Sequence, residues 1–254
     1  MMQEADAMPS SKPSRRTLLA AAVLAGSRLP ARAQPRAAEP VDLELLLALD
    51  VSRSMDPYEQ ELQFKGYAGA FLDQRIHEAI RSGAVGAIAV SMFIWSDYHI
   101  QETLLAWTRL ASGDECIGFA QAILEAPRRI YLYTSISGAI DHAVRQFGTT
   151  FEGTRRVIDI SGDGVNNSGR PVAMARDEAV AQGIVINGLP IINDRPDPFP
   201  MRQPPLDEYY RDQVIGGAGS FIEVATGFDA FDAAVRRKML REIAAAPGGA
   251  GEVA

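Results

Sequence analysis

The chain alternates between apolar runs typical of buried strands and apolar residues spaced as on one helix face. The run Leu43–Leu49 is apolar except at Glu44 and ends at Asp50, which suits a strand buried on both faces. Later, Ile136, Ala139, Ile140, Ala143 and Phe147 recur at helical spacing. The pattern predicts strands at 43–50, 85–95, 99–107, 156–160, 184–191 and 221–225, and helices at 57–81, 171–182 and from the last strand to 246, with two more helices between 107 and 156.

Strands that alternate with helices predict a doubly wound α/β fold. We expect a mostly parallel central sheet with helices on both faces and one antiparallel edge strand, the hairpin partner at 99–107. The length and apolar content of the chain suit one core in a single domain at 41–246. We expect residues 34–40 to form a leader and residues 247–254 a flexible tail.

Segment 193–205 contains five prolines in thirteen residues, so it predicts a loop rather than a helix or an inner strand. It follows the strand at 184–191, and parallel strands place ligands beyond their shared carboxyl ends. The expected rim for a partner consists of Arg195, Phe199, Met201 and Arg202. The alternative is that the segment is only a connector.

Polar side chains follow the first strand at alternate positions, namely Asp50, Ser52 and Ser54. Oxygen ligands at a strand end suit a hard divalent cation, Mg²⁺ or Mn²⁺. Because the serine hydroxyls are uncharged, they leave the cation short of negative charge and open to a further anionic ligand. The pattern therefore indicates a metal site that can accept a carboxylate.

Two later residues can reach the same edge of the sheet. Thr134 lies between an apolar segment and a helical pattern, and Asp163 ends the strand-like run RRVIDISGD. Each residue has a local alternative as a helix cap or a turn former. Their joint order along the chain favours metal binding.

With DVSRS after the first strand, Thr134 before a middle helix and SGDG at a later strand, the chain resembles the von Willebrand factor type A family over residues 41–246. The resemblance implies a metal-ion-dependent adhesion site, abbreviated MIDAS. In it Ser52, Ser54 and Thr134 hold the cation, and Asp50 and Asp163 reach it directly or through water. It also implies a non-enzymatic module whose metal accepts a carboxylate from a partner protein or ligand, in an exported bacterial branch without an assigned function.

Two alternatives remain. Asp50 followed by GDGVNN at 162–167 is also similar to haloacid-dehalogenase-like phosphatases, with Asp50 as the nucleophile of a Mg²⁺-dependent hydrolase. However, Ser52 and Asn167 stand where that family needs aspartates, and no lysine lies between Lys65 and Asp163. The third possibility is a metal that only stabilises the fold.

Residues 1–33 resemble a twin-arginine signal peptide. Arg15-Arg16 precedes an apolar run at 18–26 and the small-residue pattern Ala31-Arg32-Ala33. The apolar run is far shorter than the roughly 20 residues that span a bilayer. We therefore expect export to the periplasm, with no stable membrane span in the mature form.

The net charge of the chain limits the classes of partner that it is expected to bind. The full chain carries −7, and residues 1–33 contain five basic and two acidic side chains, so residues 34–254 carry −10. An acidic protein without a basic run disfavours nucleic acid and anionic lipid surfaces. Cys116 is the only cysteine, so an internal disulfide is excluded.

Overall fold

A computed structural model describes residues 38–192, 204–227 and 230–245 of the chain. Its main sheet has six strands in the order β4-β3-β2-β6-β7-β8. All neighbouring strands in it are parallel except β3 and β4. The strands are β2 (Leu43–Asp50), β3 (Ile88–Trp95), β4 (Gln101–Leu110), β6 (Arg156–Gly162), β7 (Ile184–Ile192) and β8 (Ala225–Thr226). The doubly wound α/β fold with one antiparallel edge strand is thereby confirmed.

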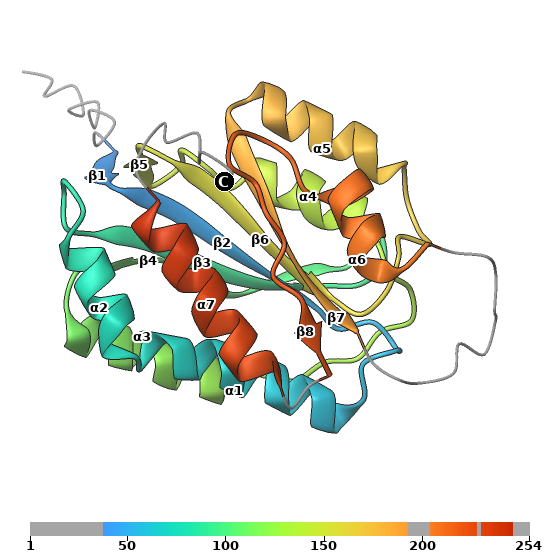
Figure 1. Cartoon of the computed structure of the whole chain (residues 1–254), viewed down its shortest axis with the longest axis horizontal. Coiled ribbons are helices and arrows are strands. Elements are labelled where there is room, and N and C mark those ends of the chain that lie inside the picture. The colour runs from blue at the N-terminus through green and yellow to red at the C-terminus, as the bar shows by residue number, and fades with distance from the viewer. Residues whose placement is uncertain (1–37, 193–203, 228–229, 246–254) are drawn as a thin grey trace, which may run out of the picture. The chain divides into compact units, whose positions relative to one another are not determined.

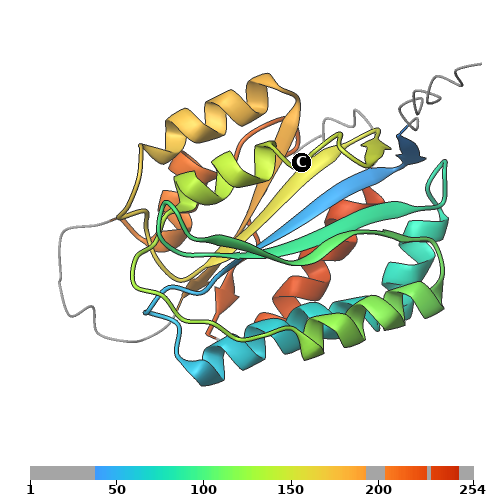
Figure 2. The same ribbon diagram turned by 180° about the vertical axis from the view of Figure 1, so that it is seen from behind.

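Helices cover both faces of this sheet (Figures 1 and 2). One face carries α1 (Pro57–Phe71), α2 (Gln74–Arg81), α3 (Gly113–Glu125) and α7 (Phe231–Ala244). The other carries α4 (Ile136–Val144), α5 (Val172–Ala181), the short α6 (Leu206–Tyr209) and the π-helical turn η1 (Tyr210–Val214). The sheet is therefore the middle of three layers.

Residues of β2 show how the two cores are divided. Leu43, Leu45, Leu47 and Leu49 belong to the core under α1, α2, α3 and α7, whereas Leu46 and Ala48 belong to the core under α4 and α5. Successive strand residues point to opposite faces. Asp50 lies two residues after Ala48 and four after Leu46, so its side chain is on the same face of the strand as theirs. It therefore points toward the α4 and α5 layer.

The single helix predicted at 57–81 is wrong, because the structure contains two helices there. Leu72 ends α1, and Asp73 begins α2 by accepting a hydrogen bond from the Arg75 amide at 2.9 Å. An aspartate that caps an amide two residues ahead begins a new helix rather than continuing the old one.

Several predicted strand bounds also shift. The strand predicted at 85–95 begins at Ile88, because the amides of Val85 and Gly86 donate instead to the Asp42 carboxylate at 2.9 and 2.8 Å. The antiparallel strand extends past 107 to Leu110. The strand predicted at 221–225 is reduced to Ala225–Thr226 with a bridge at Ile222, and the Phe221 amide donates to the Asn187 side chain at 3.0 Å.

Two features were not predicted. A small parallel sheet joins β1 (Glu39–Val41) to β5 (Phe151–Gly153), so Glu39 and Pro40 are strand residues although the sequence predicts a leader there. The second is η1, whose Tyr210 is fully buried under β7. Tyr210 brings its hydroxyl to the carboxyl end of the sheet, where the candidate site lies.

Candidate metal site at the carboxyl edge of the sheet

Asp50 is the last residue of β2, and its side chain is fully buried. Its Oδ1 accepts a hydrogen bond from the Ser52 amide at 2.7 Å, which fixes the turn that follows the strand. Its Oδ2 accepts no hydrogen bond from any residue that the structure describes. A buried carboxylate oxygen without a partner is costly, so this atom has a strong tendency to bind a cation or a donor.

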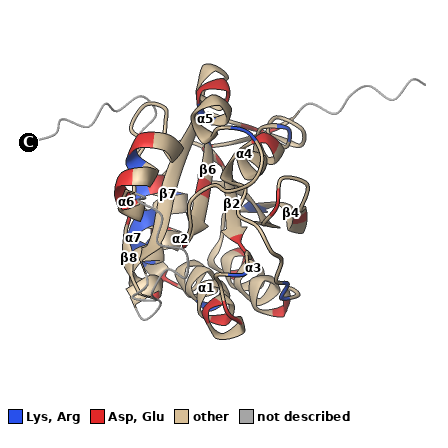
Figure 3. Ribbon diagram, turned by 90° about the vertical axis from the view of Figure 1, so that its right-hand side faces the viewer, with Lys and Arg blue, Asp and Glu red and all other residues tan. Residues whose placement is uncertain are grey.

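A chain of hydrogen bonds links the first strand end to the second. Ser52 Oγ lies 3.1 Å from Ser54 Oγ, and Ser54 Oγ donates to Asp163 Oδ1 at 2.6 Å. Asp163 follows Gly162, the last residue of β6, which pairs directly with β2. Residues 109 positions apart in the sequence therefore meet at one edge of the sheet, which Figure 3 views from the carboxyl ends of β2 and β6.

Gly162 leaves the space that the side chain of Asp50 occupies. A Cβ atom at residue 162 would lie 2.8 Å from Asp50 Oδ2 and 3.0 Å from the Tyr210 hydroxyl. Gly164 differs, since a Cβ there would lie 3.6 Å from Thr134 Oγ1, which is ordinary contact. The absent side chain at residue 162 thus leaves room for the Asp50 carboxylate beside Tyr210.

Thr134 reaches the same edge from the segment before α4, and it is 5% exposed. Its amide donates to Asn167 Oδ1 at 2.9 Å, and its carbonyl accepts from the Asn167 amide at 2.8 Å. Asn167 therefore fixes the backbone of Thr134 from both sides. The sequence analysis did not predict this role for Asn167, and the doubled asparagine after Asp163 was the available signal for it.

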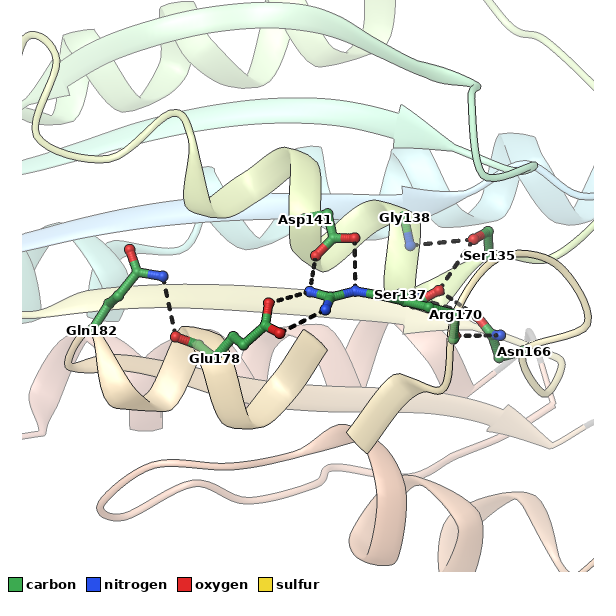
Figure 4. Close-up of polar contacts among 8 residues, drawn as sticks. All are labelled: Ser135, Ser137, Gly138, Asp141, Asn166, Arg170, Glu178 and Gln182. Carbon is green, nitrogen blue, oxygen red and sulfur yellow. Dashed lines mark hydrogen bonds and ion pairs between the residues drawn. The ribbon is translucent and has the colours of Figure 1, made fainter. Parts of the chain in front are cut away.

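The loop after Asp163 is attached to α4 and α5 by further polar contacts (Figure 4). Asn166 Oδ1 accepts a hydrogen bond from the Ser137 amide at 3.1 Å. Arg170 pairs with Asp141 of α4 at 2.6 Å and with Glu178 of α5 at 2.5 Å. These contacts hold the Asp163 loop and the Thr134 segment in a fixed relation, which a binding site needs.

The electrostatics of the site are unfavourable to its own carboxylates. Burial, and then the negative charge of Asp163, raise the pKa of Asp50 well above its ordinary value. Burial and the charge of Asp50 likewise raise the pKa of the Tyr210 hydroxyl. Among the described residues, no lysine or arginine forms an ion pair with Asp50. A bound cation would therefore be favoured here.

The five predicted metal residues fit a hard divalent cation by their chemistry. They supply carboxylate and hydroxyl oxygens only, the donors that Mg²⁺ and Mn²⁺ prefer. No cluster of three or more His, Cys, Asp or Glu side chains suited to a metal occurs in the described parts of the chain. A site here therefore depends on the hydroxyls of Ser52, Ser54 and Thr134 as much as on its two carboxylates.

The other predicted binding residues, Arg195, Phe199, Met201 and Arg202, lie outside the described residues, as do 1–33 and 247–254. Within the described ranges, no helix has the length and apolar character needed to cross a membrane.

Solved structures of low sequence identity share this fold. A von Willebrand factor type A protein from Catenulispora acidiphila is 13% identical, with a TM-score of 0.57 over 80% of this chain and 43% of that one. The pilus adhesin SpaC from Lactobacillus rhamnosus GG is 14% identical, with a TM-score of 0.58 over 81% of this chain and 30% of that one. The proximal thread matrix protein 1 from the mussel byssus, solved with a zinc-occupied MIDAS motif, is 11% identical, with a TM-score of 0.51 over 82% of this chain and 49% of that one.

The fold is therefore that of a von Willebrand factor type A domain, which confirms the resemblance. The chain belongs to the family described as "Protein of unknown function (DUF1194)", which matches residues 40–247. It spans less than half the length of the three structures above. No curated protein matches the sequence.

Proposed function

We propose that this protein is an exported binding module that depends on a divalent cation. Asp50, Ser52, Ser54, Thr134 and Asp163 hold Mg²⁺ or Mn²⁺ at the carboxyl edge of the sheet. The cation accepts a carboxylate from a partner protein or an acidic ligand, because five side-chain oxygens leave a position of its octahedral coordination shell open. The protein is not an enzyme.

The observation that carries this proposal is the buried Oδ2 of Asp50, which has no hydrogen-bond partner among the described residues. It lies within an oxygen-only set that hydrogen bonds already connect. The mussel protein with a zinc-occupied MIDAS motif supports metal binding by this fold. The pilus adhesin supports a role in protein contacts.

A phosphatase mechanism has no support in the geometry. Asn167 uses its side-chain oxygen on the Thr134 amide, so it does not act as the later carboxylate of a hydrolase. Both described lysines are engaged elsewhere, Lys65 with Glu61 and Lys238 with Asp159 and Glu242. Neither of these described lysines is therefore placed to balance a phosphoaspartate, and Ser52 stands where the general acid would be needed.

The proposed location is the periplasm, through the twin-arginine pathway. The motif around Arg15 and Arg16 and the acidic remainder of the chain support it. Mass spectrometry of periplasmic protein is expected to find a mature start at Gln34. A start upstream of Leu18 would contradict this part of the proposal.

Isothermal calorimetry with Mg²⁺ and Mn²⁺ tests the metal site. The wild-type protein should bind one ion, and Asp50→Ala should abolish binding, because it removes one of the site's two carboxylates. Circular dichroism should show that the variant keeps its fold.

Asp114→Ala is the matched control, since Asp114 is an exposed carboxylate in the first turn of α3. That helix follows β4, whose end Leu110 pairs with the start of β3, at the opposite edge of the sheet. The control should bind metal as the wild type does. Equal metal affinity in Asp50→Ala and wild type would contradict the proposed site.

A further inference from the structure

A cavity of about 350 Å³ opens beside the proposed metal site, between three loops. Its lining residues are Arg53 after β2, Asp97 and Ile100 between β3 and β4, and Ile130, Tyr131, Leu132 and Tyr133 before α4. Arg53 lies between Ser52 and Ser54, and Tyr133 directly precedes Thr134. The cavity and the metal site therefore share two of their loops.

Three large apolar side chains of this cavity are exposed. Ile130, Leu132 and Tyr133 are 45%, 64% and 52% exposed, and they fall within four consecutive residues. Exposed apolar side chains that occur singly are ordinary, whereas such a group around a hollow marks a contact surface.

The loop that carries these side chains is held in place by its backbone. The Tyr131 amide donates to the Val51 carbonyl at 2.9 Å, and the Ser135 amide donates to the Ser96 carbonyl at 2.6 Å. The Ser96 hydroxyl also donates to the Tyr133 carbonyl. Because hydrogen bonds to two strand ends already fix the cavity wall, binding a ligand costs little conformational entropy in this loop.

The charges around the cavity are arranged asymmetrically. Arg53 is exposed, beside the metal site, and it forms no ion pair with the residues that the structure describes. At another wall, the Ser168 hydroxyl and the Tyr98 amide hold the pKa of Asp97 below its ordinary value. A partner's negative charge is therefore attracted to the Arg53 and metal side and repelled from the Asp97 side.

We propose that the cavity binds the side chain of a large apolar residue adjacent to an aspartate or glutamate in a partner peptide segment. This inference rests on the proposed function, since the acidic side chain goes to the cation beside Arg53. The apolar side chain lies among Ile130, Leu132 and Tyr133. The volume is near the lower end for ligand pockets, which suits one large side chain better than a cofactor.

Blocked peptides Gly-Gly-Asp-Xaa-Gly, with Phe, Leu, Ser or Lys at Xaa, are the probes. Fluorescence anisotropy with the purified protein in Mg²⁺ should show the Phe and Leu peptides binding about tenfold more tightly than the Ser peptide, as expected for one buried apolar side chain. The Lys peptide should bind no better than the Ser peptide. Replacing Asp by Asn in the peptide, or adding a chelator, should abolish binding.

Two variants test which residues of the cavity determine the affinity for the peptides. Leu132→Ser should remove about tenfold of the affinity for the Phe peptide, while calorimetry shows Mg²⁺ still bound. Arg53→Gln should weaken all Asp-containing peptides by a few fold, more at low salt than at high salt. Met174→Ser is the control, since Met174 on α5 is 53% exposed and lies away from the cavity lining. It should bind as the wild type does.

The failures are distinguishable. If Mg²⁺ fails to bind, both the proposed function and this inference are wrong. If Mg²⁺ and the peptides bind but Phe, Leu and Ser peptides are equivalent, only the inference is wrong. If light scattering shows that Leu132→Ser converts a dimer into a monomer, a second copy of the chain covers the cavity and the inference is also overturned.

Discussion

Buried carboxylates lie on both faces of the central sheet, and the two groups differ in how their negative charge is balanced. Asp159 in β6 points toward α1 and α7, where Lys238 Nζ lies 2.6 Å from Asp159 Oδ1 and 2.6 Å from Glu242 Oε1. Asp50 at the end of β2 points toward the other layer, where no described lysine or arginine pairs with it. The first set, Asp159 and Glu242 with Lys238, is called the internal group, and it contains its own positive charge. The second set, Asp50 with Asp163, is called the edge group, and no described lysine or arginine pairs with its Asp50.

The difference follows from position in the sheet. Asp159 lies in the middle of β6 and is covered by α7 and by Tyr67 of α1, whose hydroxyl is 3.4 Å from its Oδ1. An ion from solvent has no way to reach it, so only a side chain can balance its charge. Asp50 lies at an edge where loops end, so an ion from solvent can serve. The sheet therefore separates carboxylates that are balanced by Lys238 from the edge where we propose an exchangeable cation.

The largest expected effect comes from removing the permanent cation. Lys238→Met should destabilise the protein by about 3 to 5 kcal/mol, because Asp159 and Glu242 remain buried without a counter-charge. Urea unfolding measures this. Lys65→Met is the matched control, since Lys65 is 60% exposed and its ion pair among the described residues is with Glu61 on its own helix. It should change stability by less than about 0.5 kcal/mol. An equally small loss in Lys238→Met would remove the basis of the comparison.

The internal group should also give the protein a pH dependence. Burial, which Lys238 only partly offsets, raises the pKa of Glu242 to about 7 from 4.5. Over that range the folded state retains a proton that the unfolded chain has released, so this group makes stability fall as pH rises from 4.5 to 7. The loss should reach at most about 3 kcal/mol.

Glu242→Gln isolates that effect, because glutamine can still accept from Lys238 and Asn187, which contact Glu242 Oε1 at 2.6 and 2.9 Å. Unfolding should be measured across pH 4.5 to 7 for both proteins. The stability of the wild type relative to the variant should decrease with rising pH. A difference in stability between the two proteins that is constant with pH would mean that Glu242 does not hold the proton retained in the folded state.

The edge group should respond to added metal instead. With Mg²⁺ at about one hundred times its dissociation constant, the wild type should gain about 2.7 kcal/mol over the same protein in chelator. Asp50→Asn should lose this gain. In chelator the variant should be as stable as the wild type or more so, because burial and Asp163 disfavour the charged form of Asp50. Thermal unfolding checks both statements, and a wild type that is insensitive to Mg²⁺ would contradict them.

Sequence patterns predicted the edge better than the interior. The apolar run before Asp50 and the turn residues after Asp163 are local signals, and parallel strands bring such ends together, so both residues and Thr134 were predicted at one edge. The pairing of Asp159 with Lys238 joins residues far apart in the sequence. A lysine at helical spacing predicts only a solvated face, so no local pattern could have indicated its burial.

The same limit explains the errors in the fold. The end of α1 depends on the Asp73 cap, and the late start of β3 depends on Asp42, a residue of another segment. The burial of Tyr210 by η1 depends on the shape of β7 around Gly188, where a Cβ would lie 2.6 Å from the Tyr210 ring. Side-chain periodicity carries no information on such contacts between segments.

The smallest expected effect tests whether the edge group needs the space that Gly162 leaves. Gly162→Ala would place a Cβ 2.8 Å from Asp50 Oδ2, so the carboxylate must move, at a cost of about 1 to 2 kcal/mol in stability. Mg²⁺ affinity should fall about tenfold because one ligand is displaced. Calorimetry and urea unfolding measure the two quantities.

Gly164→Ala is the matched control for this substitution. It adds the same methyl group two residues later, at 3.6 Å from Thr134 Oγ1, and the backbone there is not in the left-handed region. Metal affinity should therefore stay within about twofold of wild type. If the two alanine variants lose affinity equally, the loop as a whole is sensitive and Gly162 has no particular role. If neither loses it, Asp50 does not reach the cation, and the exchangeable charge on this face of the sheet must be held by Asp163 and the hydroxyls alone.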